Sequence, residues 1–381
     1  MNDVNIERKA YILISDIYSS KNYVLKEIVD NGFKIIAFFT MVNKYLRVKN
    51  SLNFEYVDYS MISNGSIMDN IRSVKKHLNA NNGELKLCIT ESAPELAEQH
   101  FFSSISEKAN KPKRLSSIFT KRRKIENNSC TNLVNTNKNL DNFDNKTLNS
   151  NYLFNDPVIQ KSEYGIQYFI DTVTYHSKHY ICGICKVVDY DFNEGKKLPQ
   201  YWDFIHPDDT KIKNCISYVK ELLDISDIEY GFAHSKVIMD KDGAFDLFEF
   251  RPGIVGGEGI VSKLNKEFIG YDQPNLLCKL INCTEDIKYK KQVYYYRVFF
   301  LYSSSFSYKR VDEVKLETLD SYHMHRIYKN NSINKSNDFD TEGETTEVVL
   351  KNMVFEDIEN DSNKLLEMKE SGILFMNTIK Y

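Results

Sequence analysis

The residues best suited to chemistry lie between positions 231 and 259. Glu249 and Arg251 stand two apart at the end of a patterned segment, and Gly256 and Gly257 follow them. A carboxylate there can hold Mg²⁺, whose hard charge bridges phosphate oxygens, and an arginine fork suits a phosphate or a carboxylate. A glycine-rich turn lets backbone approach a ligand closely. A tight structural turn and a simple ion pair between Glu249 and Arg251 would explain the same residues.

Two strands joined by a tight turn are expected to position these groups. Residues 230–239 and 244–250 have the composition of strands, and the Asp-Gly turn at 240–243 predicts that they form a hairpin. His234 lies in the first strand between apolar neighbours. A structural histidine and a site residue are both compatible with that position.

The N-terminal part has the pattern of a small doubly wound domain. An apolar run at 10–16, an amphipathic segment at 21–31 and a second apolar run at 33–39 predict a β-α-β unit. A further strand is expected at 85–89. Continuous apolar strands are typical of a parallel sheet that is covered on both faces.

Ordered structure is expected again in the second half of the chain. Strands are predicted at 168–174 and 178–188, and apolar residues at helical spacing predict a helix over 208–223. The aromatic run 293–302 is expected to form a half-buried strand rather than a base-stacking platform, and another strand is expected at 347–351.

The segment between these two parts has an unusual composition. Residues 108–124 contain eight basic side chains, which form either a solvated helix face or a phosphate-contacting cluster. Residues 127–155 contain eleven asparagines and few large apolar side chains. Such a segment buries too little surface to offset its ordering entropy, so we expect a disordered linker or loop there.

Bulk composition limits the possible functions. The 381 residues are 42% hydrophobic, and 50 Lys and Arg nearly balance 53 Asp and Glu, so no global field favours nucleic acid or an anionic membrane. Apolar runs are shorter than a transmembrane helix needs, and the first residues lack a signal-peptide pattern. We therefore expect a cytoplasmic protein with no nucleic-acid or membrane partner.

Two pairs of potential metal ligands are interpreted as structural. Cys182 and Cys185 form a lone CxxC in an expected strand, where residues three apart face opposite sides. His323 and His325 flank Met324 and would share a strand face, but no third ligand is evident in the sequence.

In their order, these pieces resemble the ATP-grasp superfamily, in particular its amino-acid-ligase-like carboxylate–amine ligases. Those proteins run from a Rossmann-like N-terminal domain through a central nucleotide domain to a smaller C-terminal region. Residues 11–39 resemble their first β-α-β unit, 165–174 the glycine-containing strand of the nucleotide domain, and 231–257 the metal-site hairpin. The resemblance covers residues 10–125 and 157–260.

The resemblance implies a fold that combines α/β and α+β parts. The expected divisions are a Rossmann-like N-terminal domain at 1–105, a basic and asparagine-rich linker or reduced lid at 106–156, an ATP-grasp-like nucleotide and metal domain at 157–290, and a C-terminal α+β region at 291–381.

The resemblance also implies roles for individual residues. Arg251 corresponds to the catalytic arginine that steadies the transferred phosphoryl group, and Glu249 to an acidic Mg²⁺ ligand. The residues placed at the ATP site are Lys121, Lys124, Gln160, Gln167, His234, Lys236, Gly256 and Gly257. ATP and Mg²⁺ are therefore the implied cofactors.

Several positions depart from the family pattern. Lys236 stands where the family has an acidic ligand two residues after the histidine, and Gln167 replaces an acid expected after Gly165. Lys161 likewise follows Gln160 where an acid is common. The asparagine-rich stretch occupies the place of the nucleotide lid and contains no Lys-Pro pair, so efficient ligase activity is in doubt.

Three functions are compatible with the sequence. The first is an ATP- and Mg²⁺-dependent carboxylate–amine ligase that acts through an acyl phosphate on small amino or carboxylic acids in peptide or specialised-metabolite synthesis. The second is a non-catalytic ATP-grasp relative, a pseudoenzyme that binds a nucleotide, a small molecule or a partner enzyme. The third is an unrelated Rossmann-like binder whose glycine turn is structural. A homodimer is possible in each case.

Overall fold

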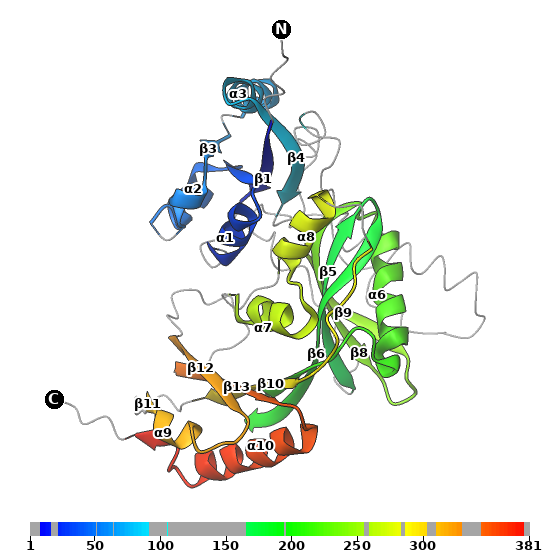
Figure 1. The fold of residues 1–381 in the computed structure, drawn as a ribbon, viewed down its shortest axis with the longest axis vertical. Helices are drawn as coiled ribbons and strands as arrows, with labels where there is room; N and C mark the ends of the chain where they lie inside the picture. The colour runs from blue at the N-terminus through cyan, green and yellow to red at the C-terminus, as the bar shows by residue number, and fades with distance from the viewer. Residues whose placement is uncertain are drawn as a thin grey trace, which may run out of the picture.

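The computed structural model contains a four-stranded and an eight-stranded β-sheet with helices packed against them (Figure 1). Within the described residues, no helix is long and apolar enough to cross a membrane. The structure describes residues 8–16, 22–50, 52–63, 65–90, 105, 165–193, 196–254, 259–282, 286–302, 310–329 and 344–376.

The N-terminal sheet has four parallel strands, as the continuous apolar runs predict. In spatial order they are β3 (Tyr59–Ile62), β2 (Lys34–Phe39), β1 (Lys9–Ser15) and β4 (Gly83–Thr90). Alternate strand residues pack on α1 (Asn22–Asp30) and α2 (Val42–Val48) on one face. The others pack on α3 (Ile67–Ala80) on the opposite face. A short 3₁₀ helix, η2 (Phe54–Tyr56), precedes β3.

The larger sheet has eight strands, and every neighbouring pair is antiparallel. In spatial order they are β12 (Tyr322–Lys329), β13 (Glu344–Asn352), β10 (Tyr295–Tyr302), β7 (Lys196–Phe204), β6 (Lys178–Asn193), β5 (Ile166–Tyr175), β8 (Tyr230–Met239) and β9 (Phe245–Pro252). The regions expected at 157–290 and 291–381 therefore both contribute strands to one sheet.

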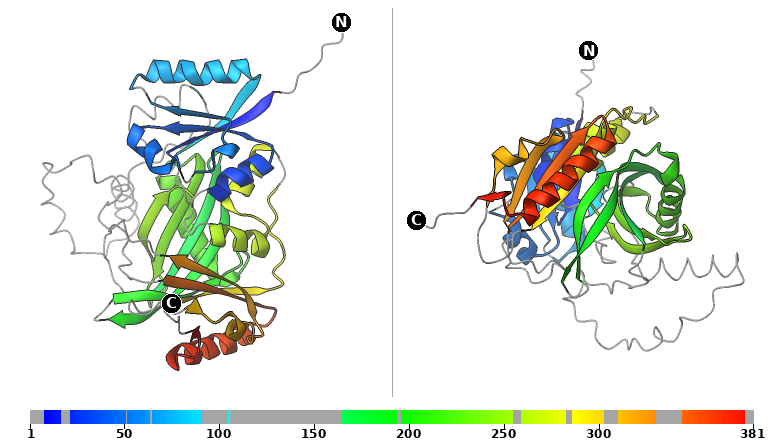
Figure 2. Two further views of the ribbon diagram at one scale, coloured as in Figure 1. Left: turned by 90° about the vertical axis from the view of Figure 1, so that its left-hand side faces the viewer. Right: turned by 90° about the horizontal axis from the view of Figure 1, so that it is seen from below.

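Helices cover both faces of this sheet. On one face pack α6 (Lys213–Ile225), α9 (Glu313–Leu316) and α10 (Phe355–Glu370). On the other pack α7 (Ile260–Ile269) and α8 (Gln273–Asn282). Figure 2 places the N-terminal sheet and α10 at opposite ends of the molecule. The described elements also include the 3₁₀ helix η3 (Thr210–Ile212) and the two-stranded ribbon of β11 (Arg310–Val311) and β14 (Phe375–Met376).

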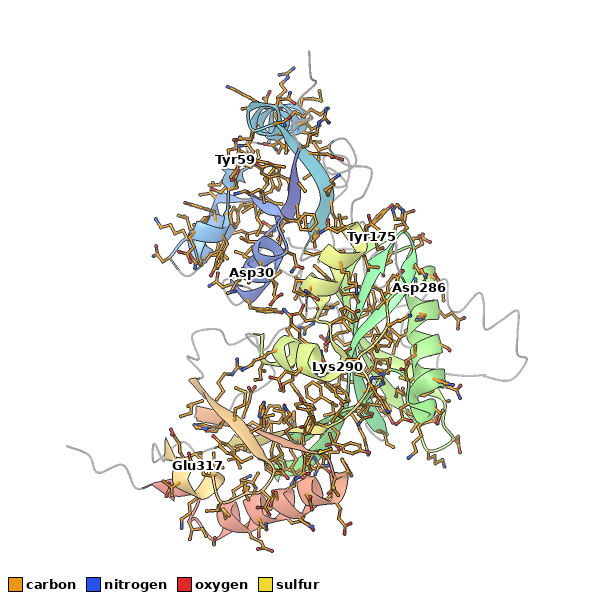
Figure 3. All side chains as sticks on the ribbon, viewed as in Figure 1. Asp30, Tyr59, Tyr175, Asp286, Lys290 and Glu317 are labelled. Atoms are coloured by element: carbon orange, nitrogen blue, oxygen red, sulfur yellow. The ribbon has the colours of Figure 1, made fainter. Side chains whose placement is uncertain are left out.

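The N-terminal sheet and the end of the large sheet share one hydrophobic core. Val173 of β5 and Phe232 of β8 are fully buried in the same cluster as side chains from β1, β2, α1 and α8. Tyr175, labelled in Figure 3, lies at this end of β5 and packs against that cluster. An ion pair of 2.8 Å between Lys266 of α7 and Glu27 of α1 adds a polar contact.

Most predicted elements form close to their expected bounds. The first β-α-β unit, the 230–250 hairpin and the strands around 168–188 are confirmed. The helix expected from 208 begins only at Lys213, because Asp209 accepts a hydrogen bond from the Lys211 amide and starts the 3₁₀ turn η3 first. The domain boundaries stay predictions. The segment at 127–155 lies outside the described residues.

Two structural expectations about side-chain direction were wrong, each because of a β-bulge. A β-bulge after Tyr322 turns His323 toward Glu267 of α7, at 3.4 Å, and leaves His325 facing α9, so the two histidines do not share a face. Cys182 is the extra residue of a β-bulge in β6, so it faces the same side as Cys185, with Cys182 packed near α8 and Cys185 near α7. Burial raises the pKa of both thiols well above its ordinary value.

Arg297 joins β10, β7 and α10 and is 1% exposed. Its Nε and Nη2 donate to the two Asp203 oxygens at 2.6 and 2.9 Å, and Nη2 also donates to Glu359 Oε1 at 2.7 Å. Nη1 donates to Ser362 Oγ, and the guanidinium lies 3.8 Å from the centre of the Tyr201 ring. Burial opposes the charge, but the two carboxylates raise the pKa of Arg297 above its ordinary value.

Truncating Arg297 should therefore destabilise the protein strongly. Arg297→Ala is expected to lower the free energy of unfolding by about 3–5 kcal/mol, because Asp203, whose side chain is only 13% exposed, is left without its partner. Arg297→Lys should lower it less, since a lysine keeps the charge but not the fork. In urea titrations, Arg72→Ala is the control: its ion pair with Asp69 is exposed, and the change should stay within about 0.5 kcal/mol. Equal losses in both alanine variants would contradict this assignment.

His179 of β6 gives the fold a specific pH dependence. The buried ring lies between Thr174 Oγ1 (2.7 Å) and Asp224 Oδ1 (3.0 Å), and burial lowers the pKa of His179 below 6.5. A lowered pKa in the folded state means that stability is complete above the unfolded value and declines as pH falls below about 6.5. Urea titrations at pH 7.5 and 5.5 should show a smaller loss in His179→Gln than in the wild type. An identical loss in both proteins would count against this role.

Candidate functional site

The hairpin β8–β9 is fixed by its turn. Asp240 Oδ1 accepts hydrogen bonds from the amides of Asp242 and Ala244, both at 2.9 Å, and Gly243 has φ +80°, where a side chain would be strained. This turn sets the pairing of the strands. Together with a one-residue bulge in β9, the turn places His234 opposite Arg251 on the neighbouring strand.

A bulge in β9 arranges the next pair. Lys236 lies opposite Glu249, but Val237 pairs with Leu247, so Phe248 is an extra residue on β9. Leu247 and Phe250 both pack into the core beneath α6, which leaves Phe248 and Glu249 directed to the other side. The bulge thus places two adjacent β9 residues beside Lys236.

Lys236 is held by aromatic rings and faces an acidic residue. Its Nζ lies 4.6 Å from the centre of the Phe248 ring and 5.4 Å from that of Phe169. Glu249, opposite Lys236, forms an ion pair with Arg251. The Arg251 side chain is 74% exposed, so this ion pair contributes little to stability and leaves the fork accessible.

His234 is oriented by a buried carboxylate on the neighbouring strand. Its Nδ1 lies 2.7 Å from Asp171 Oδ1, and Asp171 is 4% exposed. The ring of Phe169 contacts His234, with the centroids 5.4 Å apart. Asp171 therefore lies inside β5 as a partner of the histidine. This arrangement fixes the imidazole while leaving it partly exposed.

Gln167 lies further along the same face of β5. Its Nε2 donates to Asp189 Oδ2 of β6 at 3.0 Å. The position thus carries an amide that is hydrogen-bonded to an acid from the neighbouring strand.

Four of the predicted site residues are brought together by the hairpin, namely Arg251, Glu249, Lys236 and His234. Gln167 is on the same face but farther along β5. Lys121, Lys124, Gln160, Gly256 and Gly257 lie outside the described residues, and their roles stay predictions. Sequence reasoning missed Phe169 and Phe248. The alternation in β5 could have placed Phe169 with Asp171, but one sequence carries no signal for the bulge.

The sequence comparisons find no relative, whereas solved structures do match. No protein-family model and no curated protein matches the sequence. The L-amino acid ligase from Bacillus licheniformis has a TM-score of 0.60 and 12% identity, over 98% of this chain and 100% of that one. Phosphoribosylglycinamide synthetase from Anaerococcus prevotii has a TM-score of 0.55 and 13% identity, over 98% and 100%. The chain has the ATP-grasp fold.

A further ATP-grasp structure supports the same assignment. N5-carboxyaminoimidazole synthase from Aspergillus clavatus, crystallised with ADP and 5-aminoimidazole ribonucleotide, has a TM-score of 0.56 and 8% identity, over 96% of this chain and 99% of that one. The likeness extends across both sheets, because each of the three structures covers nearly the whole chain. The expected fold, α/β and α+β with a Rossmann-like N-terminal domain followed by an ATP-grasp-like domain, is thereby confirmed, and its two sheets are parallel and antiparallel, respectively.

Buried polar atoms of α7 lie close to this ATP-grasp sheet. Ser262 and Asn265 are each 2% exposed. Within the described part of the chain, Ser262 Oγ, Asn265 Oδ1 and Trp202 Nε1 have no hydrogen-bond partner. Asn265 packs directly on Gly183, which pairs with Asp171, so the helix lies close to the strand that orients His234.

The approach of α7 to β6 requires a glycine at position 183. A Cβ there would lie 2.1 Å from Asn265 Nδ2, so Gly183→Ala should lower the free energy of unfolding by about 1–3 kcal/mol. Asn265→Ala should relieve the clash, and the double variant should regain most of the loss in a denaturant titration. Losses that simply add would show that the two residues are not in contact.

Proposed function

We propose that this protein is an ATP-dependent carboxylate–amine ligase acting on small amino or carboxylic acids. The observation that carries the proposal is the strip of His234, Lys236 and Arg251 on the exposed part of an ATP-grasp sheet. The fold supports the reaction class, and the strip supplies nitrogen donors suited to phosphate oxygens. The N-terminal sheet borders one end of that strip through the shared core.

The proposed reaction needs positioning and charge stabilisation rather than a covalent protein group. A substrate carboxylate oxygen attacks the γ-phosphorus of ATP, the bond to ADP breaks, and an acyl phosphate forms. The amine then attacks the acyl carbon and releases phosphate. Arg251 and Lys236 would stabilise charge on the phosphoryl oxygens, and His234, held by Asp171, would donate a hydrogen bond or accept the proton of the attacking amine.

Mg²⁺ is the metal usually associated with such chemistry, and Glu249 is the predicted ligand. Its carboxylate lies between Arg251, with which it forms an ion pair, and Lys236 on the opposite strand. Among the described residues, no group of three His, Cys, Asp or Glu side chains could hold a metal ion. Because Glu249 is already paired with Arg251 and faces Lys236, the described residues of the hairpin do not fit a divalent cation, and none of the proposed steps depends on one.

The position of Lys236 opposite Glu249 also favours a second function. An intact metal site would not place a lysine opposite the acidic ligand, so Lys236 also supports a non-catalytic relative that binds a nucleotide without turnover. The substrates, the pathway and a partner enzyme would then differ from those of a ligase. The two functions are distinguished by whether ATP is consumed.

The test is ATP consumption with mixtures of amino and carboxylic acids. We expect release of ADP and phosphate that requires both an acid and an amine. Arg251→Lys should lower kcat/KM by about 10²-fold or more, because a point charge does not reproduce the planar fork. Arg72→Lys, on the exposed face of α3, is the control and should leave the rate unchanged. Nucleotide binding without product from any mixture would replace the ligase with the second function.

A further inference from the structure

Lys236 occupies the place in the hairpin where a cation would neutralise phosphate charge. Its ammonium group is bounded by the rings of Phe169 and Phe248, at 5.4 and 4.6 Å from the ring centres. The negative faces of two rings stabilise an ammonium ion and restrict its movement. The bulge at Phe248 creates this arrangement, because it supplies the second ring beside Glu249. The lysine is therefore positioned by its surroundings.

The neighbouring carboxylates are already engaged by protein cations or donors. Glu249 forms an ion pair with Arg251, and Asp171, which is 4% exposed, is bonded to His234. A divalent ion beside Glu249 would also be repelled by Lys236 across the strand pair. The local balance of charge thus favours an anionic ligand over a metal ion.

The three nitrogen-bearing groups have a spacing suited to a chain of phosphates. Arg251 and His234 are opposite each other on adjacent strands, which places their Cβ atoms about 5 Å apart. Lys236 lies two residues along the strand from His234, a rise of about 7 Å. One anion that extends along the hairpin can therefore meet all three groups.

We propose that the Lys236 ammonium takes the place of a divalent cation, so that the hairpin binds the polyphosphate of a nucleotide directly as the metal-free anion. This inference rests on the proposed function, because it assumes that the strip is the nucleotide site. It adds that this site needs no Mg²⁺ to bind its ligand. A built-in charge on a fixed side chain replaces a soluble one.

The test is calorimetry of the full-length protein with ADP and with inorganic tripolyphosphate, in EDTA and in Mg²⁺. The wild type should bind with similar affinity in both buffers. Lys236→Met should weaken binding in EDTA by about tenfold or more, the loss expected for a hydrogen bond between charged groups. Lys236→Glu should lose binding in EDTA and regain ADP binding when Mg²⁺ is added, because two carboxylates would then face each other across the strands.

A matched control separates this effect from the general loss of a lysine. Lys178 also lies over an aromatic ring, 5.5 Å from the centre of Tyr180, but at the turn between β5 and β6, so Lys178→Met should bind like the wild type. Thermal unfolding of each variant confirms that the fold is intact. Wild-type binding that requires Mg²⁺, or unchanged binding by Lys236→Met in EDTA, would overturn the inference but leave the ligase proposal standing. No ADP binding in either buffer would instead contradict the proposed function itself.

Discussion

The register of β8 controls the rest of the site. This strand pairs with β5 from Tyr230 to Met239 and with β9 from Ala233 onward, so each residue from Ala233 to Met239 has a fixed neighbour on both sides. Because side chains alternate along a strand, a slip of one residue would exchange the two faces. Lys236 would then be buried against α6, and Val237 would face solvent. The apolar contacts of Val237 and Ala233 beneath α6 prevent that exchange.

The face of β5 that carries Phe169, Asp171, Val173 and Tyr175 is apolar at one end and polar in the middle. At one end, Val173 and Tyr175 contact the core shared with the N-terminal sheet. In the middle, Asp171 orients His234, and Phe169 lies against Lys236. The polar strip therefore begins where the apolar contact between the sheets ends. A ligand on the strip would lie next to the N-terminal sheet without any further adjustment of the chain.

The sequence predicts local structure better than it predicts the site. Apolar runs identify β1, β2 and β4, and the Asp-Gly turn identifies the hairpin of β8 and β9, because these signals are local. The strand pairing that brings Asp171 to His234 joins residues 63 apart, and composition carries no information about it. The bulges at Phe248 and His323 each redirect side chains by one position, which alternation cannot anticipate. The order of motifs, rather than any single motif, supported the correct fold.

The core shared by the two sheets has a consequence for how the protein is made. Val173 and Phe232 come from the large sheet, yet they are covered by β1, α1 and α8. A truncated chain that lacks the N-terminal sheet would expose this apolar surface and would be prone to aggregate during synthesis. The N-terminal part is made first, but the portion of its core that Val173 and Phe232 cover is completed only after β5 and β8 have left the ribosome. Completion of the shared core therefore has to wait for residues well beyond the first hundred.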